Sequence, residues 1–110
     1  MTYHFPGTKG VVESTISAQN TFTPSLETRG MFNFSVSGTF VGTITIQRSF
    51  DLVDSNGVWI PDNSKTWHDL ETYTSPAEDI GIQPEEQLVV RAGIKTGDYT
   101  SGSATLRISR

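Results

Sequence analysis

The residues that could carry out catalysis are few and far apart in this sequence. It has two histidines, His4 and His68, and of these only His68 has a neighbouring carboxylate, on Asp69. A zinc site needs three or four converging protein ligands, and a serine nucleophile needs a histidine base that an acid orients. The sequence suggests neither arrangement and lacks a Gly-x-Ser-x-Gly elbow. We therefore expect no enzyme activity, no metal site and no cofactor.

The charge and hydropathy of the chain argue against two classes of partner. Twelve Asp and Glu against eight Lys and Arg give a formal net charge of -4, and the basic residues are dispersed singly. Nucleic-acid binding uses a basic stripe that neutralises successive phosphates, so nucleic acid is not an expected partner. The sequence has no secretory signal pattern and no apolar run of about 18 residues, so we expect no membrane partner. The absence of cysteine favours a reducing environment.

Apolar and polar residues alternate over several short segments, which is the pattern of half-buried β-strands. The predicted strands cover residues 31–36, 39–50, 87–94 and 104–109, with weaker signals at 12–17 and 21–23. Their apolar faces should form one shared core. Its predicted members are Phe32, Phe34, Phe40, Ile44, Ile46, Leu88, Val90, Leu106 and Ile108.

Short turn segments separate these strands, and no longer window has the apolar spacing of a helix. Strands spaced about 8–12 residues apart, with Gly and Asn turns between them, predict an antiparallel two-sheet sandwich. The predicted fold class is therefore all-β and jelly-roll-like, with an Ig-like topology as the alternative. We expect an irregular N-terminal arm over residues 1–10 and a single β-sandwich domain over residues 11–110.

Two segments carry aromatic and apolar side chains without strand periodicity. They are the N-terminal arm and residues 64–84, the latter being a long connection or an edge strand. Aromatic side chains that the core does not need mark partner-binding surfaces when they are exposed. We therefore predict that a partner contacts Tyr3, Phe5, Trp67, Leu70 and Tyr73.

The segment Ser49-Phe50-Asp51, followed by Gly57-Val58-Trp59, is similar to an expanded form of the hairpin in sialidase-type repeats. In those repeats serine and aspartate bond to the turn backbone, and the tryptophan packs beneath the turn. We expect Asp51, Asn56 and Gly57 to shape a turn here and Trp59 to close the edge of the sheet. An exposed Trp59 would instead favour carbohydrate binding.

Longer stretches of the chain form a second pattern, at residues 38–51, 57–59 and 99–108 together with the strand around Arg91, and they span roughly residues 36 to 109. These stretches resemble small virion proteins of tailed bacteriophages. Within that family, the length and the cysteine-free all-β character are similar to the capsid cement, or staple, protein of short-tailed phages of the epsilon-fifteen type. The resemblance implies a jelly-roll-like sandwich on the outside of the icosahedral shell, without enzymatic residues.

The resemblance also implies a partner, the major capsid protein, whose neighbouring subunits such a protein clamps. The expected location is the capsid exterior of the virion, after synthesis in the cytoplasm of the host bacterium. A second copy of the same chain, forming a homodimer, is the other partner considered. Two alternative functions stay open: a tail or receptor-binding β-sandwich that recognises host carbohydrate, and a host-derived Ig-like adhesion domain.

Overall fold

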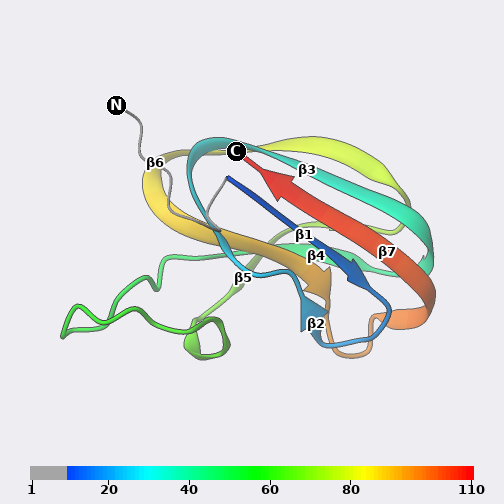
Figure 1. The fold of residues 1–110 in the computed structure, drawn as a ribbon, viewed down its shortest axis with the longest axis horizontal. Coiled ribbons are helices and arrows are strands. Elements are labelled where there is room, and N and C mark those ends of the chain that lie inside the picture. Colours follow the sequence, from blue (N-terminus) through cyan, green and yellow to red (C-terminus); the bar gives the residue numbers. More distant parts are fainter. Residues whose placement is uncertain (1–9) are drawn as a thin grey trace.

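A computed structural model describes the backbone of residues 10–110, and their side chains except at 29–30 and 80–87 (Figure 1). The predicted N-terminal arm, with Tyr3 and Phe5, therefore lies almost entirely outside the described residues. The strands are β1 (Val11–Ile16), β2 (Thr21–Phe22), β3 (Leu26–Gly42), β4 (Ile44–Ser49), β5 (His68–Tyr73), β6 (Ala77–Ile94) and β7 (Tyr99–Ser109). A short 3₁₀ helix, η1 (Asp62–Ser64), lies between β4 and β5.

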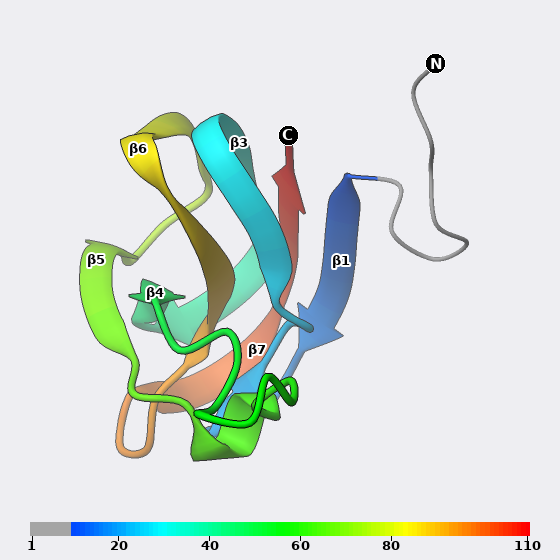
Figure 2. The same ribbon diagram turned by 90° about the vertical axis from the view of Figure 1, so that its left-hand side faces the viewer.

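The long strands β3 and β6 belong to both layers of the fold (Figure 2). Residues 26–28 of β3 pair with 88–90 of β6, and residues 30–36 pair with 77–83. The register shifts between Thr28 and Gly30, and such irregularities bend paired strands. The two strands thus bend together, and each contributes one half to each layer. The first half of β3 (26–28) lies with the second half of β6 (88–94) in one layer. The second half of β3 (30–42) lies with the first half of β6 (77–83) in the other.

The order of the strands is that of a jelly roll. Eight segments result when the halves of β3 and β6 are counted separately and β2 is joined to the first half of β3. One layer contains β1, β7, the second half of β3 and the first half of β6. The other contains β2 with the first half of β3, the second half of β6, β4 and β5.

Numbered along the chain, the two layers read 1-8-3-6 and 2-7-4-5, with all neighbours antiparallel. This is the two-layer arrangement of a jelly roll, so the predicted all-β sandwich is confirmed. An Ig-like topology is excluded, because its layers contain a different set of strands.

The hydrophobic core lies between the two layers and consists of alternate residues from each strand. All the predicted core residues are buried except Phe40, which is partly buried and packs against the others. Residues that extend the core beyond the prediction are Ile16, Leu26, Val36, Ala92, Ile94 and Ala104. The period-2 pattern identified the core correctly because inward positions alternate along every strand.

Several predicted strand boundaries are wrong, since β3 begins at Leu26 rather than 31, β6 at Ala77 rather than 87 and β7 at Tyr99 rather than 104. The sequence predicts a turn at Ser37-Gly38, but β3 continues through both residues and stays paired with β7. The chain leaves β3 at Gly42, where a Cβ atom would lie 2.4 Å from the carbonyl oxygen of Asp98. Segment 39–50 therefore contains the end of β3 and all of β4, in different layers. Segment 64–84 contains β5, which is an edge strand, and the beginning of β6. An edge strand was one of the two alternatives predicted for this segment, the other being a long connection.

Replacement of Phe34 by alanine should lower the free energy of unfolding by about 3–5 kcal/mol, because it removes buried surface and leaves a cavity. The Phe34 side chain is 2% exposed, whereas that of Phe50 is 46% exposed. Phe50→Ala is the matched control and should cost less than about 1 kcal/mol. Urea denaturation measures both values, and equal losses in the two variants would contradict the assigned core.

Candidate binding surface

The segment between β4 and β5, residues 50–67, leaves the sandwich as a projecting arm (Figure 1). We call it the hairpin arm. Val53 and Trp59 form an isolated antiparallel bridge, and the Ile60 N–H donates to the Leu52 carbonyl over 3.0 Å. The predicted hairpin is therefore present, although it stands away from the sheet.

The turn of the hairpin is shaped by Asp54 rather than by Asp51. The Oδ1 atom of Asp54 accepts hydrogen bonds from the backbone N–H groups of Asn56, over 2.8 Å, and Val58, over 3.0 Å. The N–H of Gly57 donates to the Asp54 carbonyl. Asp51 instead accepts a bond from the Thr66 N–H and closes the base of the arm. The prediction was wrong for Asp51 because a nearer aspartate, two residues before Asn56, makes the local turn.

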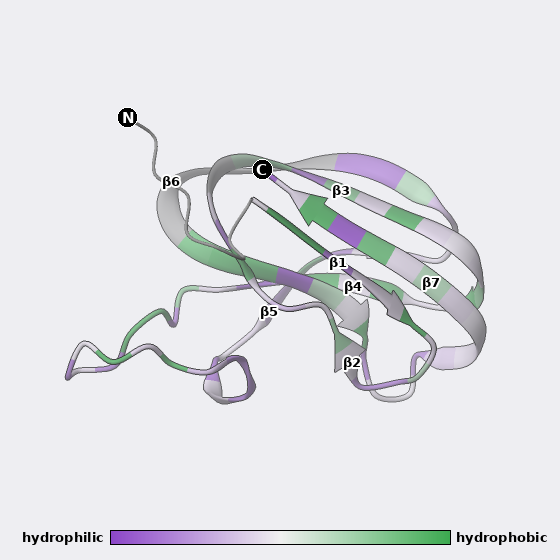
Figure 3. Cartoon of the chain, viewed as in Figure 1, coloured by the Kyte–Doolittle hydropathy of each residue, from purple (hydrophilic) through white to green (hydrophobic). Residues whose placement is uncertain are grey.

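Apolar side chains lie exposed along the hairpin arm, which Figure 3 shows with hydrophobic segments far from the core. Phe50, Val53, Val58 and Trp59 are each between 46% and 59% exposed. The expectation that Trp59 closes a sheet edge is wrong, since the side chain is half exposed. Grouped apolar side chains on a surface are typical of partner-binding sites.

A buried lysine fixes the orientation of Trp59. The side chain of Lys65 is fully buried, and its ammonium donates to the carbonyl of Ile60. The Nζ atom also lies 4.3 Å from the centroid of the Trp59 ring and 4.0 Å from Oδ1 of Asp62. Because a buried ammonium must keep such partners, the indole is held in one position while half of it faces solvent.

At the base of the arm, the guanidinium of Arg91 stacks against two aromatic rings. Its Cζ atom lies 3.9 Å from the centroid of the Phe22 ring and 4.1 Å from that of Trp67. Arg91 thus contacts both rings at once. We call Phe22, Arg91 and Trp67 the arginine clamp. Burial lowers the pKa of Arg91 from its ordinary value, but so basic a group stays charged.

A chain of polar contacts joins the arginine clamp to β5. Nε of Arg91 donates to Oε1 of Gln47 over 3.0 Å, and Nε2 of Gln47 donates to Oδ1 of Asp69 over 2.9 Å. Nζ of Lys95 donates to Oδ2 of Asp69 over 2.8 Å. Sequence reasoning missed this cluster, because its members come from four stretches far apart in the sequence and no spacing rule relates them.

The partner-contact residues predicted from the sequence do not share one surface in the described part of the chain. Trp67 belongs to the arginine clamp, whereas Leu70 and Tyr73 on β5 are partly buried against the core. The Tyr73 ring lies 5.1 Å from that of Phe34, and its hydroxyl donates to Asp79 over 2.8 Å. Burial and the Asp79 carboxylate raise the pKa of Tyr73. Partner contact through these residues stays a prediction.

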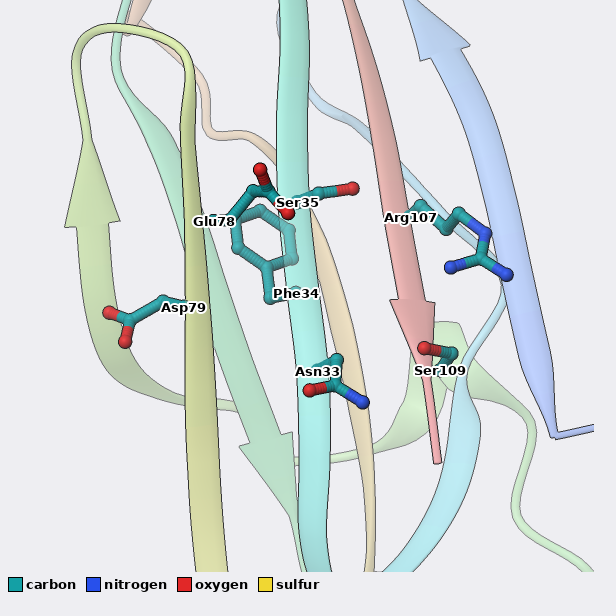
Figure 4. A pocket seen from close by; sticks show the side chains of 7 residues that line it. All are labelled: Asn33, Phe34, Ser35, Glu78, Asp79, Arg107 and Ser109. Carbon is teal, nitrogen blue, oxygen red and sulfur yellow. The ribbon is translucent and has the colours of Figure 1, made fainter.

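A depression of about 550 Å³ lies on the layer that contains β7 (Figure 4). Its lining residues are Asn33, Phe34, Ser35, Glu78, Asp79, Arg107 and Ser109. Within the described residues, no group of three His, Asp or Glu side chains could hold a metal ion. No helix there is long and apolar enough to span a bilayer. Six of the seven lining residues carry polar or charged side chains, whereas the hairpin arm exposes large apolar ones, so the arm is the stronger candidate surface for a protein partner.

The Asp69–Lys95 ion pair gives a prediction about titration. The hydrogen bond from Lys95, and then that from Gln47, hold the pKa of Asp69 below its ordinary value of 3.8. The ionised Asp69 carboxylate therefore stabilises the folded state at pH values above 3.8, and this stabilisation is lost as the pH falls through the lowered pKa. Lys95→Met should raise the pKa of Asp69 towards 3.8, as measured by NMR titration of its carboxyl carbon. Arg107→Met, in the other layer, is the control, and an unchanged pKa in Lys95→Met would show that the ion pair does not form in solution.

Comparison with models of known protein families finds no match to this chain. Curated protein sequences and solved structures also show no significant match. What the hairpin arm binds must therefore be inferred from its own chemistry.

Proposed function

We propose that this chain is a structural virion protein, a capsid cement that attaches to the outer surface of a phage shell and stabilises neighbouring major capsid subunits. The observation that carries the proposal is the hairpin arm, which exposes Phe50, Val53, Val58 and Trp59. In this role the arm inserts between two capsid subunits, and the jelly roll provides its rigid support. The proposed role is structural, with no catalytic step.

The energetics of the arm support attachment to a protein surface. Burying apolar area contributes roughly 25 cal/mol per Å², and a preformed aromatic anchor loses little conformational entropy on binding. Trp59 is such an anchor, because Lys65 already holds its ring. Many copies on one shell would each bridge subunits, so modest affinity per copy would suffice to stabilise the assembled particle by mass action.

The charge of the chain and its resemblance to phage virion proteins support the same location. A net charge of -4 suits the exterior of a shell whose interior faces DNA. The jelly-roll order agrees with the fold that the resemblance implies. The proposed partner is therefore the major capsid protein, with synthesis in the cytoplasm of the host bacterium before attachment.

The test is to mix the purified protein with capsid shells assembled without it, and to measure occupancy and the melting temperature of the shells. Trp59→Ala should weaken attachment on the order of 30-fold, since truncating an aromatic anchor costs about 2 kcal/mol or more. Val41→Ala is the control, because Val41 is 57% exposed against 50% for Trp59 but lies near the end of β3, outside the arm. Failure of the unmodified protein to bind shells would remove the proposal.

Carbohydrate binding in a tail or receptor-binding module is the second candidate, and the half-exposed indole of Trp59 favours it. A flat aromatic face beside polar groups such as Asp54 and Asn56 suits stacking against a sugar ring. If this function holds, oligosaccharides from the host surface should quench Trp59 fluorescence saturably, and Trp59→Ala should abolish binding. Trp59→Ala keeps Trp67, so the quenching that this variant loses is assigned to Trp59, and absence of saturable quenching in the unmodified protein would reject the candidate.

A further inference from the structure

We propose that Arg91 is a positioning residue that holds the hairpin arm in one orientation against the sandwich. Arg91 lies in the second half of β6, which is paired on both sides, with β4 and with β2 and β3. Its backbone is thus among the firmly held parts of the layer. Its guanidinium projects from this support and stacks on Trp67, the last residue of the arm.

A continuous set of contacts leads from Arg91 to the exposed tryptophan. Nε1 of Trp67 donates to the Asp62 carbonyl over 2.9 Å, and the Lys65 N–H donates to the same oxygen over 3.3 Å. The Lys65 ammonium in turn bonds to the arm at Ile60 and faces the Trp59 ring. Each step is a hydrogen bond or a ring contact, so the position of Trp67 determines the position of Trp59.

Among the described residues, few other contacts tie the arm to the sandwich. The Asp62 carboxylate accepts bonds from the N–H of Ser25, over 3.2 Å, and from its hydroxyl, over 2.8 Å. At the base of the arm the Asp51 N–H donates to Oγ of Ser49 over 3.1 Å, and Cζ of Arg48 lies 5.2 Å from the centroid of the Phe50 ring. The backbone–backbone bonds of the arm join its own residues. Loss of the arginine clamp should therefore leave the hairpin formed but free to reorient about its base.

The consequence for attachment rests on the proposed function. A binding element that is correctly oriented for a fraction of the time binds with an affinity reduced by that fraction. Arg91 would thus raise affinity without touching the partner. Its effect should require Trp59, because Trp59 is the side chain whose placement Arg91 controls.

The orientation of the arm can be measured without any partner. The chain has no cysteine, so Ser55→Cys in the hairpin turn and Thr39→Cys on β3 give two unique spin-label positions. Double electron–electron resonance should give a narrow distance distribution in the otherwise unmodified protein. Arg91→Met should broaden it about twofold or more, and Arg91→Lys should also broaden it, because an ammonium keeps the charge but lacks the planar guanidinium that contacts both rings and donates to Gln47.

The controls separate arm release from unfolding. Arg107→Met removes an exposed arginine from the other layer and should leave the distribution narrow. Far-UV circular dichroism and core amide protection should be unchanged in Arg91→Met. If that variant does not fold, Trp67→Leu removes the clamp from the arm side and should produce the same broadening. A narrow distribution in the folded variant overturns the proposal.

A double-mutant cycle, measured as binding to capsid shells, tests whether Arg91 raises the affinity of attachment through the placement of Trp59. Arg91→Met should weaken attachment about tenfold alone, and should add no further loss when Trp59→Ala is already present. Independent, additive losses would show that Arg91 acts by another route. If the unmodified protein does not bind shells, the cement proposal fails, while the spin-label distances still decide the role of Arg91 in holding the arm.

Discussion

The pairing of β3 with β6 continues through both layers of the sandwich, and most other contacts are built on it. One end of this ribbon supports β7 and β1, and the other supports β4 and β5. The ribbon must bend near Gly30 for the two layers to face each other and bury a common core. Without cysteine or a metal cluster among the described residues, hydrophobic burial between these layers is the main source of stability.

The outer face of the layer that contains β4 is also largely covered. Thr45, Gln47 and Ser49 on β4 and Val89 on β6 are buried, although they point away from the core. The arginine clamp lies on this face and provides apolar ring surface together with hydrogen-bonding groups. The arm is thus joined to the sheet by a cation in contact with two aromatic rings, an interaction that depends on geometry more than on buried area.

The exposed and buried parts of the arm have opposite chemistry. Apolar side chains, including Trp59, face solvent, while the ammonium of Lys65 is enclosed beneath them. This reverses the usual distribution, in which lysine is exposed and tryptophan is largely buried. A protein gains stability from such an arrangement when a partner covers the apolar side chains, which is why the arm is interpreted as a binding element.

Alternation of apolar and polar residues in the sequence determined the all-β class, nearly all of the core and the approximate strand positions, because inward and outward side chains alternate with period two. The order of strands, the continuation of β3 through Gly38 and the layer change at Gly42 were decided by tertiary pairing, since each depends on contacts with β7 or with Asp98. The arginine clamp joins Phe22, Trp67 and Arg91, which lie far apart in the sequence. The exposure of Trp59 likewise follows from where the hairpin arm leaves the sandwich, and a local sequence pattern contains no information about that direction.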